Sequence, residues 1–416
     1  MAEQHGKTLV PQIRFAGFTD PWEQRKLGEV ATFGGGHTPS MSDSDNYEGG
    51  NVLWVTSQDV KSHYLDGTTT QITEKGAKEL TLYPAGSLVM VTRSGILRHT
   101  LPVAELRKPS TVNQDIRVIL PQENYYGQWL LQFFISRNKE LLLEFGKTGT
   151  TVESVDFSKM RDMVLLTPSL PEQQQIGRYF ARLDNLITLH QRKYDKLCVL
   201  KKSMLDKMFP KGGSLYPEIR FAGFTDPWEQ RKLGDILQER NIRTSDFEGN
   251  PIFSLTIEDG VTPKTDRYER TSLITKTEDL FKIVSPNEFV TNPMNLRFGA
   301  FGYNKNSFSV CVSGYYDVFS IDNDKCSGFW GSYFKTPIAL KRFDDAATGS
   351  LIEKRRVKFS TLCQLVFLMP EEMKEKKQIA AFFDRLDSLI TLHQRKYCGV
   401  VSWMLGVALV RLSSEK

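Results

Sequence analysis

Residues 11–30 of the chain read PQIRFAGFTDPWEQRKLGEV, and residues 217–236 read PEIRFAGFTDPWEQRKLGDI. Seventeen of these twenty positions are identical. A second pair follows in each half, FARLDNLITLHQRKY at 180–194 and FDRLDSLITLHQRKY at 383–397. The copies are offset by 206 and 203 residues, a period too long for a solenoid repeat. The sequence therefore predicts a duplicated domain with a pseudo-two-fold relation between its halves.

The segments between these copies diverge almost completely, as NVLWVTSQDVKSHYLDG at 51–67 and NPIFSLTIEDGVTPKTD at 250–266 illustrate. Short β-branched or aromatic runs bounded by Gly, Pro, Asn or Ser predict strands. These runs are Val52–Thr56, Ser87–Thr92, Asp115–Leu120, Phe308–Val312 and Asp317–Ile321. The stretches Gln128–Glu144 and Gly331–Phe343 predict helices packed on the strands. We therefore expect two different α+β lobes, joined to segments that are nearly the same.

Each half should end in a long helix. Pro171 is a favourable first helical residue, and no proline interrupts the chain from there to Phe209, so the helix would span roughly 58 Å. Apolar and aromatic residues recur in steps of four and three, which predicts a coiled-coil seam. The seam positions are Ile176, Phe180, Leu183, Ile187, His190, Tyr194 and Leu197 in the first copy, and Ile379, Phe383, Leu386, Ile390, His393 and Tyr397 in the second.

Two such helices in one chain are expected to pack on each other. His190 and His393 occupy the same seam position, where a metal pair or a pH switch is one interpretation. A histidine that fixes the helix register is the favoured one, so no metal site is predicted.

These markers divide the chain into segments. We expect a tail at 1–10, a first lobe at 11–168, a first long helix at 169–210, a linker at 211–216, a second lobe at 217–370, a second long helix at 371–410 and a tail at 411–416.

Composition narrows the class of protein. The 416 residues carry 54 Lys plus Arg against 49 Asp plus Glu, a net charge of +5, and the two expected helices hold all of this excess. Five cysteines without CxxC spacing predict reduced thiols rather than disulfides or zinc ligands. Neither a membrane-spanning run nor a secretory leader is apparent, so we expect a cytoplasmic protein without membrane contact.

Catalytic patterns are lacking. The segment Gly146-Lys147-Thr148 has no upstream glycine at the spacing of a phosphate-binding loop, and the glycine clusters at 33–36 and 298–302 are interpreted as turns. The segment Asn292-Pro293-Met294 lacks the second proline and the aromatic residue of the Asn-Pro-Pro-aromatic motif of amino-methyltransferases. Neither HExxH nor GxSxG occurs. The sequence thus predicts no catalytic residues and no bound cofactor.

The order of the markers, RKLG before each variable lobe and LPEQQQIGRYFARLDNLITLHQRKYDKL at 170–197 after the first, resembles the specificity subunit of Type I restriction-modification systems. The resemblance covers essentially the whole chain. It implies that each lobe is a target recognition domain that reads one half of a split double-stranded DNA sequence. It also implies that the two helices pair antiparallel, set the gap and dock two modification subunits.

By the same resemblance the chemistry belongs to partners. Modification subunits would hold S-adenosylmethionine and methylate adenine, and restriction subunits would use ATP and Mg²⁺ for translocation and cleavage. Two alternatives remain open: a coiled-coil scaffold that binds proteins, and a self-contained DNA methyltransferase or nuclease.

Polar turns next to predicted strands are the candidate DNA contacts, because base edges are read by such side chains. In the first lobe Thr92-Arg93-Ser94-Gly95 resembles a strand-end loop of the family, and further candidates are Thr56, Ser57, Gln58, Asn113 and Gln114. In the second lobe the candidates are Asn292, Asn295, Arg297, Tyr303, Asn304 and Lys305.

Two further features concern the duplicated segments and the long helices. The duplicated aromatics Phe15, Phe18 and Trp22, and their copies Phe221, Phe224 and Trp228, are expected to pack or dock rather than to stack on flipped bases. The second helix departs from the first after Tyr397, where CGVVSWMLGVALVRLSSEK replaces a basic helix end. That end is either buried against a partner or altered so that docking suffers.

Overall fold

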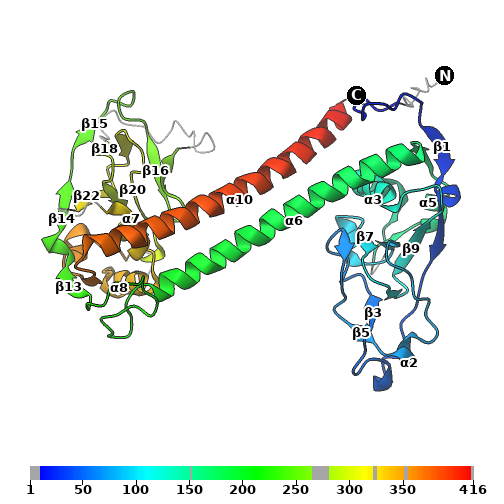
Figure 1. The fold of residues 1–416 in the computed structure, drawn as a ribbon. Helices are drawn as coiled ribbons and strands as arrows, with labels where there is room; N and C mark the ends of the chain where they lie inside the picture. Colours follow the sequence, from blue (N-terminus) through cyan, green and yellow to red (C-terminus); the bar gives the residue numbers. More distant parts are fainter. Residues whose placement is uncertain (1–9, 150–151, 265–280, 322–325, 351–354, 414–416) are drawn as a thin grey trace. The chain divides into compact units, whose positions relative to one another are not determined.

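The computed structural model describes residues 10–149, 152–264, 281–321, 326–350 and 355–413, with the side chains left out from 400 onward. The chain forms two units, one holding the residues up to Leu189 and from Tyr397, the other holding His190–Lys396. Both mix strands with helices (Figure 1). Among the described helices none is long and apolar enough to cross a membrane.

The first lobe is built on a five-stranded sheet in the order β2-β9-β6-β7-β4, with a three-stranded sheet β5-β3-β8 beside it. Its elements are β1 (Glu23–Lys26), α1 (Leu27–Val30), β2 (Ala31–Gly34), η1 (Ser44–Asn46), β3 (Val52–Val55), β4 (Tyr64–Leu65), β5 (Gln71–Ile72), α2 (Glu74–Ala77), β6 (Leu88–Val91), η2 (Gly95–Arg98), β7 (Val103–Leu106), β8 (Thr111–Val112), β9 (Ile116–Pro121), α3 (Gly127–Ser136), α4 (Asn138–Phe145), β10 (Gly146–Lys147), β11 (Ser154–Val155), α5 (Phe157–Arg161) and β12 (Val164–Thr167).

The second lobe has a four-stranded sheet in the order β14-β22-β19-β20. Its elements are β13 (Glu229–Lys232), η3 (Leu233–Asp235), β14 (Leu237–Arg240), β15 (Arg243–Thr244), β16 (Phe253–Thr256), β17 (Gly260–Pro263), β18 (Phe281–Val284), β19 (Phe289–Thr291), η6 (Leu296–Phe298), β20 (Phe301–Tyr303), β21 (Val310–Val312), β22 (Asp317–Ile321), α7 (Ser327–Tyr333), α8 (Pro337–Ala346), α9 (Phe359–Leu362) and β23 (Val366–Met369).

The main sheets of the two lobes share the order of four strands, although their sequences differ. Strand β2 pairs with β9 in the register Phe33↔Ile119, and β14 pairs with β22 in the register Glu239↔Phe319. The neighbouring pairs β6–β9 and β19–β22 correspond in the same way, since Leu88↔Ile119 matches Phe289↔Phe319. These four strands therefore carry different side chains at equivalent positions in the two lobes.

The duplicated segments clamp each lobe onto its helix. Arg14 donates from Nε and Nη2 to the carboxylate of Glu172, both at 2.7 Å, and the Trp22 indole donates to the same carboxylate at 3.2 Å. The second copy repeats this with Arg220, Trp228 and Glu375, at 2.7, 2.8 and 3.3 Å. Both glutamates are buried in the first turn of their helices.

The duplicated aromatics extend this clamp. Phe15 meets Tyr179 edge to face with 5.5 Å between ring centroids, and Phe221 meets Phe382 in the same way at 6.0 Å. The expected packing of the duplicated aromatics is confirmed for Phe15, Trp22, Phe221 and Trp228.

The two long helices are α6 (Leu170–Lys207) and α10 (Met373–Ser413). Within the second unit they run antiparallel, because Lys201 forms an ion pair with Asp387 while His190 meets His393. The C-terminal part of α6 and the two residues after it pack in the second lobe's core, where the ring centroids of Phe209 and Phe383 lie 6.1 Å apart. The antiparallel helix pair expected from the family resemblance is present.

Both shorter helices expected as single elements are split, so those predictions are wrong in extent. Gln128–Glu144 contains α3 and α4, which meet at Arg137, where ψ of 16° leaves the helical range. Gly331–Phe343 contains parts of α7 and α8, because Pro337 starts a new helix that the Thr336 hydroxyl caps.

Candidate nucleic-acid interface

The three candidate loops of the first lobe meet at one end of its main sheet. The backbone N–H of Asn113 donates to the Val55 carbonyl at 3.0 Å, which joins the loop after β3 to the loop before β9. Thr92 donates from its backbone to the Asp115 carbonyl at 2.8 Å, which brings in the loop after β6. The sequence identified these loops separately, and the fold places them together.

Exposure separates the candidate side chains in this group. Gln58, Arg93, Gly95 and Gln114 are exposed, and the Gln114 side chain accepts a hydrogen bond from the Thr38 hydroxyl at 2.6 Å. Ser57 is half-buried in a turn. Arg93 lies two residues after the end of β6 and forms an isolated β-bridge with Ser154.

Other candidate side chains form hydrogen bonds within the turns that contain them. The Thr56 hydroxyl donates to Asp59 at 2.8 Å, and the Thr92 hydroxyl donates to the Asp115 carbonyl at 3.1 Å. Ser94 caps η2 through its hydroxyl. Asn113 is only 6% exposed and its side-chain oxygen accepts from the Asp115 backbone, so its prediction as a base-contacting residue is wrong.

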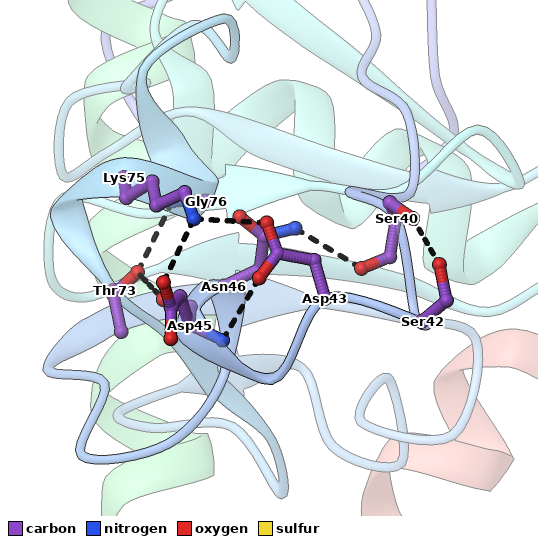
Figure 2. Close-up of polar contacts among 8 residues, drawn as sticks. All are labelled: Ser40, Ser42, Asp43, Asp45, Asn46, Thr73, Lys75 and Gly76. Atoms are coloured by element: carbon purple, nitrogen blue, oxygen red, sulfur yellow. Dashed lines mark hydrogen bonds and ion pairs between the residues drawn. The ribbon is translucent and has the colours of Figure 1, made fainter.

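A second polar cluster of the first lobe closes on itself. Figure 2 shows the Lys75 amine between the carboxylates of Asp43 and Asp45, at 2.9 and 3.0 Å. Asn46 donates to the Ser40 carbonyl and Thr73 donates to the Asp45 carbonyl, so η1 is fastened to α2. The hydrogen bonds to Asp43 and Asp45 raise the pKa of Lys75, and the hydrogen bond from Lys75 lowers the pKa of Asp43. We assign this cluster to holding the loop.

In the second lobe the candidates fall at opposite ends of the sheet. Asn292 follows β19, whereas Tyr303 ends β20, and the antiparallel register Phe289↔Tyr303 places it at the start of β19. Tyr303 packs there against α7, and Lys305 lies 3.7 Å from Asp384 of α10. Burial, together with the nearby carboxylates of Asp384 and Asp387, raises the pKa of Tyr303.

Two more second-lobe candidates are occupied. Asn304 is fully buried and donates to the carbonyls of Val284 and Phe308, both at 2.9 Å, so its assignment to DNA contact is wrong. The Arg297 guanidinium pairs with Asp344 at 3.1 Å and lies 4.4 Å from the Phe298 ring centroid. Asn292 accepts from the Met294 backbone, which leaves Asn295 as the exposed polar candidate of this loop.

Sequence reasoning missed two aromatics at this end. Phe298 is 54% exposed, and Tyr315 is 48% exposed in the turn that precedes Asp317. Asp317 pairs with Thr291, so this turn lies beside the loop after β19. An exposed aromatic next to a glycine, as in Gly314-Tyr315, is the signal that could have found it.

The seam residues are used inside the chain. Ile379, Phe383 and Leu386 are at most 5% exposed and belong to the second lobe's core, so they pack inside the chain. The remaining predicted positions are half-buried: Ile176, Phe180, Leu183, Ile187, His190, Tyr194, Leu197, Ile390, His393 and Tyr397. Leu189 and Leu392, which are equivalent in the two copies, are instead 46% and 44% exposed.

The two seam histidines touch. Nδ1 of His190 lies 2.9 Å from Nδ1 of His393, a hydrogen bond between one protonated and one unprotonated nitrogen. Burial, His190 and the nearby Lys193 and Lys396 lower the pKa of His393. Among the side chains that the structure describes, no group of three or more His, Cys, Asp or Glu could hold a metal ion.

Comparison with known proteins agrees with this architecture. A family model described as "Type I restriction modification DNA specificity domain" matches residues 19–198 and 225–399. The specificity subunit of the Type I restriction enzyme EcoR124I/EcoR124II from Escherichia coli is 31% identical over 42% of this chain and 46% of its own length. The MjaIX specificity subunit from Methanocaldococcus jannaschii is 27% identical over 52% of each chain. The chain thus spans about half the length of these curated relatives.

A solved structure has the same fold. The S subunit of a Type I restriction-modification system from M. genitalium superposes with a TM-score of 0.59 at 9% identity, over 96% of this chain and 98% of that one.

Proposed function

Since the chain belongs to the family of Type I restriction modification DNA specificity domains, we propose that it directs a DNA-modifying complex to a split target sequence. Each lobe reads one half of the target through the loops at one end of its sheet. The observation that carries this proposal is the shared strand order of the lobes, β2-β9-β6-β7 and β14-β22-β19-β20, which present unlike side chains. Equivalent scaffolds with different surfaces suit two different half-sites.

The geometry supports a particular set of contacts. In the first lobe the readers are Arg93, Gln58 and Gln114, which are exposed at the same sheet end. In the second lobe Asn295 is the polar reader, with Phe298 and Tyr315 as apolar contacts. Guanidinium and amide groups read guanine and adenine edges in the major groove, and aromatic rings contact the thymine methyl or stack.

The chain recognises the target sequence, and its partner subunits carry out methylation and cleavage. Two modification subunits bind S-adenosylmethionine and methylate the DNA, and restriction subunits use ATP and Mg²⁺. This division is supported by the family to which the chain belongs.

The duplicated helix surface docks the two modification subunits. Leu189 and Leu392 expose similar fractions of an apolar side chain at the same position of the two copies. The same partner surface can therefore be bound twice, once by each copy. Replacing both with Arg should abolish co-purification of the modification subunit, because a charge would be buried in an apolar contact. Val199→Arg is the matched control, because Val199 is 70% exposed and has Ser402 as its counterpart.

Selection from random DNA by the purified complex tests the reading function. We expect a motif of two unlike half-sites with a constant gap, and Arg93→Ala should relax one half-site only. A complex that enriches no sequence would contradict the proposal. Enrichment of partner proteins without DNA would favour a protein-binding scaffold.

A further inference from the structure

A hollow in the first lobe lies next to the loop that follows β6. It is lined by Phe33, Arg117, Phe157, Ser158, Arg161 and Asp162, and has a volume of about 410 Å³. The residues come from β2, β9 and the α5 region, up to 129 positions apart, so no sequence pattern announces the site.

The position of the hollow follows from the sheet register. Arg117 pairs with Met90 of β6, two residues before Thr92. On the other side, the backbone N–H of Val155 donates to the Thr92 carbonyl at 2.9 Å, and Phe157 follows two residues later. The hollow therefore adjoins the Thr92–Gly95 loop, which is the proposed reading loop of this lobe.

Its walls combine the guanidinium groups of Arg117 and Arg161 with two aromatic rings, and Asp162 adds one carboxylate. The rings of Phe33 and Phe157 meet edge to face at 5.0 Å between centroids, and the Arg117 guanidinium lies 5.9 Å from the Phe157 ring centroid. Both arginines are exposed, and within the described residues neither guanidinium forms an ion pair with a carboxylate. Guanidinium groups are suited to bind phosphate, whereas the rings provide an apolar wall for a sugar or a base.

The second lobe reverses the chemistry at the equivalent positions. The strand registers match Phe33 with Glu239 and Arg117 with Asp317. Gly234 lies against Cys363 in the way that Gly28 lies against Arg161, so a thiol replaces the second guanidinium. Burial raises the pKa of Asp317, Lys282 lowers it and Glu239 raises it, so two carboxylates and one amine lie near each other there. The first lobe therefore presents two guanidinium groups to an anion, where the second lobe presents two carboxylates, a thiol and one amine.

We propose that this hollow holds one nucleotide of the DNA backbone next to the first half-site, with its phosphate on Arg117 and Arg161 and its sugar or base against Phe33 and Phe157. The inference rests on the proposed DNA-reading function and assigns it a phosphate contact in one lobe only. Such a contact positions the duplex without reading sequence.

The test uses the full chain in complex with its modification subunits and the target DNA found by selection. For the double variant Arg117→Ala/Arg161→Ala we expect about tenfold weaker binding near physiological salt. The slope of log affinity against log salt should become shallower by about one, because one phosphate is no longer neutralised. The selected motif should stay the same.

The matched control removes two cations elsewhere in the lobe. Lys78 and Lys108 are exposed, and Lys108 follows β7 at the sheet end opposite Thr92, as the register Leu88↔Glu105 indicates. The variant Lys78→Ala/Lys108→Ala should leave affinity and salt slope unchanged. Thermal unfolding of both variants should match the unmodified chain, since all four side chains are exposed.

A neutral methylphosphonate placed at single positions of the DNA backbone locates the contact. At one position near the first half-site it should weaken binding by the unmodified complex and have no further effect on the Arg117→Ala/Arg161→Ala complex. If the double variant keeps full affinity and slope while the unmodified complex binds its split target, the hollow assignment is wrong and the proposed function stands. If the unmodified complex shows no sequence preference, both fail.

Free deoxyadenosine monophosphate provides the last arm. Saturable binding to the unmodified complex but not to the double variant, with DNA affinity equal in both, would assign the hollow to a small nucleotide and overturn the DNA assignment.

Discussion

The contribution of the Arg–Glu–Trp clamp to the free energy of unfolding can be predicted and measured twice, because the same contact occurs once in each unit. Glu375 is 1% exposed and holds Arg220 through two hydrogen bonds, with Trp228 as a third donor. Glu375→Gln keeps the volume but leaves the guanidinium, only 15% exposed, without a neutralising charge. Removing one partner of a buried pair costs about 3–5 kcal/mol, and we expect that loss in the second unit.

Glu172→Gln is the matched variant for the first unit, where Arg14 is 11% exposed and its two hydrogen bonds measure 2.7 Å. Hydrogen exchange under increasing denaturant resolves the opening free energy of each unit separately. Each variant should lower protection in its own unit by the stated amount. The double replacement Arg220→Met/Glu375→Leu should recover most of the loss, since no charge is left unpaired. A loss below about 1 kcal/mol for Glu375→Gln would show that this contact behaves like a surface ion pair and not a buried one.

Three further predictions concern other contacts. The pKa of His393 is lowered in the folded chain, so the unfolded chain binds the proton more readily. The second unit should therefore lose stability as pH falls through 6.5 toward the folded pKa. His393→Asn should remove that dependence in urea titrations at pH 5 and 7.5. Burial raises the pKa of Asp184, so the first unit should gain stability as pH falls through that raised value toward 3.8, and an equal pH response of Asp184→Asn would contradict this. Gly36→Ala should destabilise the first unit by about 1–3 kcal/mol in calorimetry, because its Cβ would lie 1.8 Å from the Val112 carbonyl oxygen, whereas Gly95→Ala meets open space and should not.

The long helices and the duplicated contacts could be predicted from the sequence, because they depend on local residue spacing or on repeated segments. The steps of four and three residues predicted α6 and α10, and the duplication identified Trp22 and Trp228 as parts of a common contact. The expected strands lie at β3, β6, β9, β21 and β22 within a residue or two. Such patterns depend on neighbours along the chain.

The candidate site could be predicted only in part, because strand order depends on contacts far apart in sequence. Tyr303 follows Asn292 closely along the chain, yet the β19–β20 hairpin carries it to the other end of the sheet. Asn113 and Asn304 stand in polar turns, but their amides satisfy backbone groups there. Exposure of an asparagine is decided by that bonding, which composition does not reveal.

Genomic adenine methylation tests the central claim most directly. It should be mapped by single-molecule sequencing in cells that express this chain with a cognate modification subunit, and in cells that lack the chain. We expect a new motif with two unlike half-sites, a fixed gap and methylated adenine on both strands, present only when the chain is expressed. A methylation pattern that is the same with and without the chain, although the complex with the modification subunit can be isolated, would contradict it.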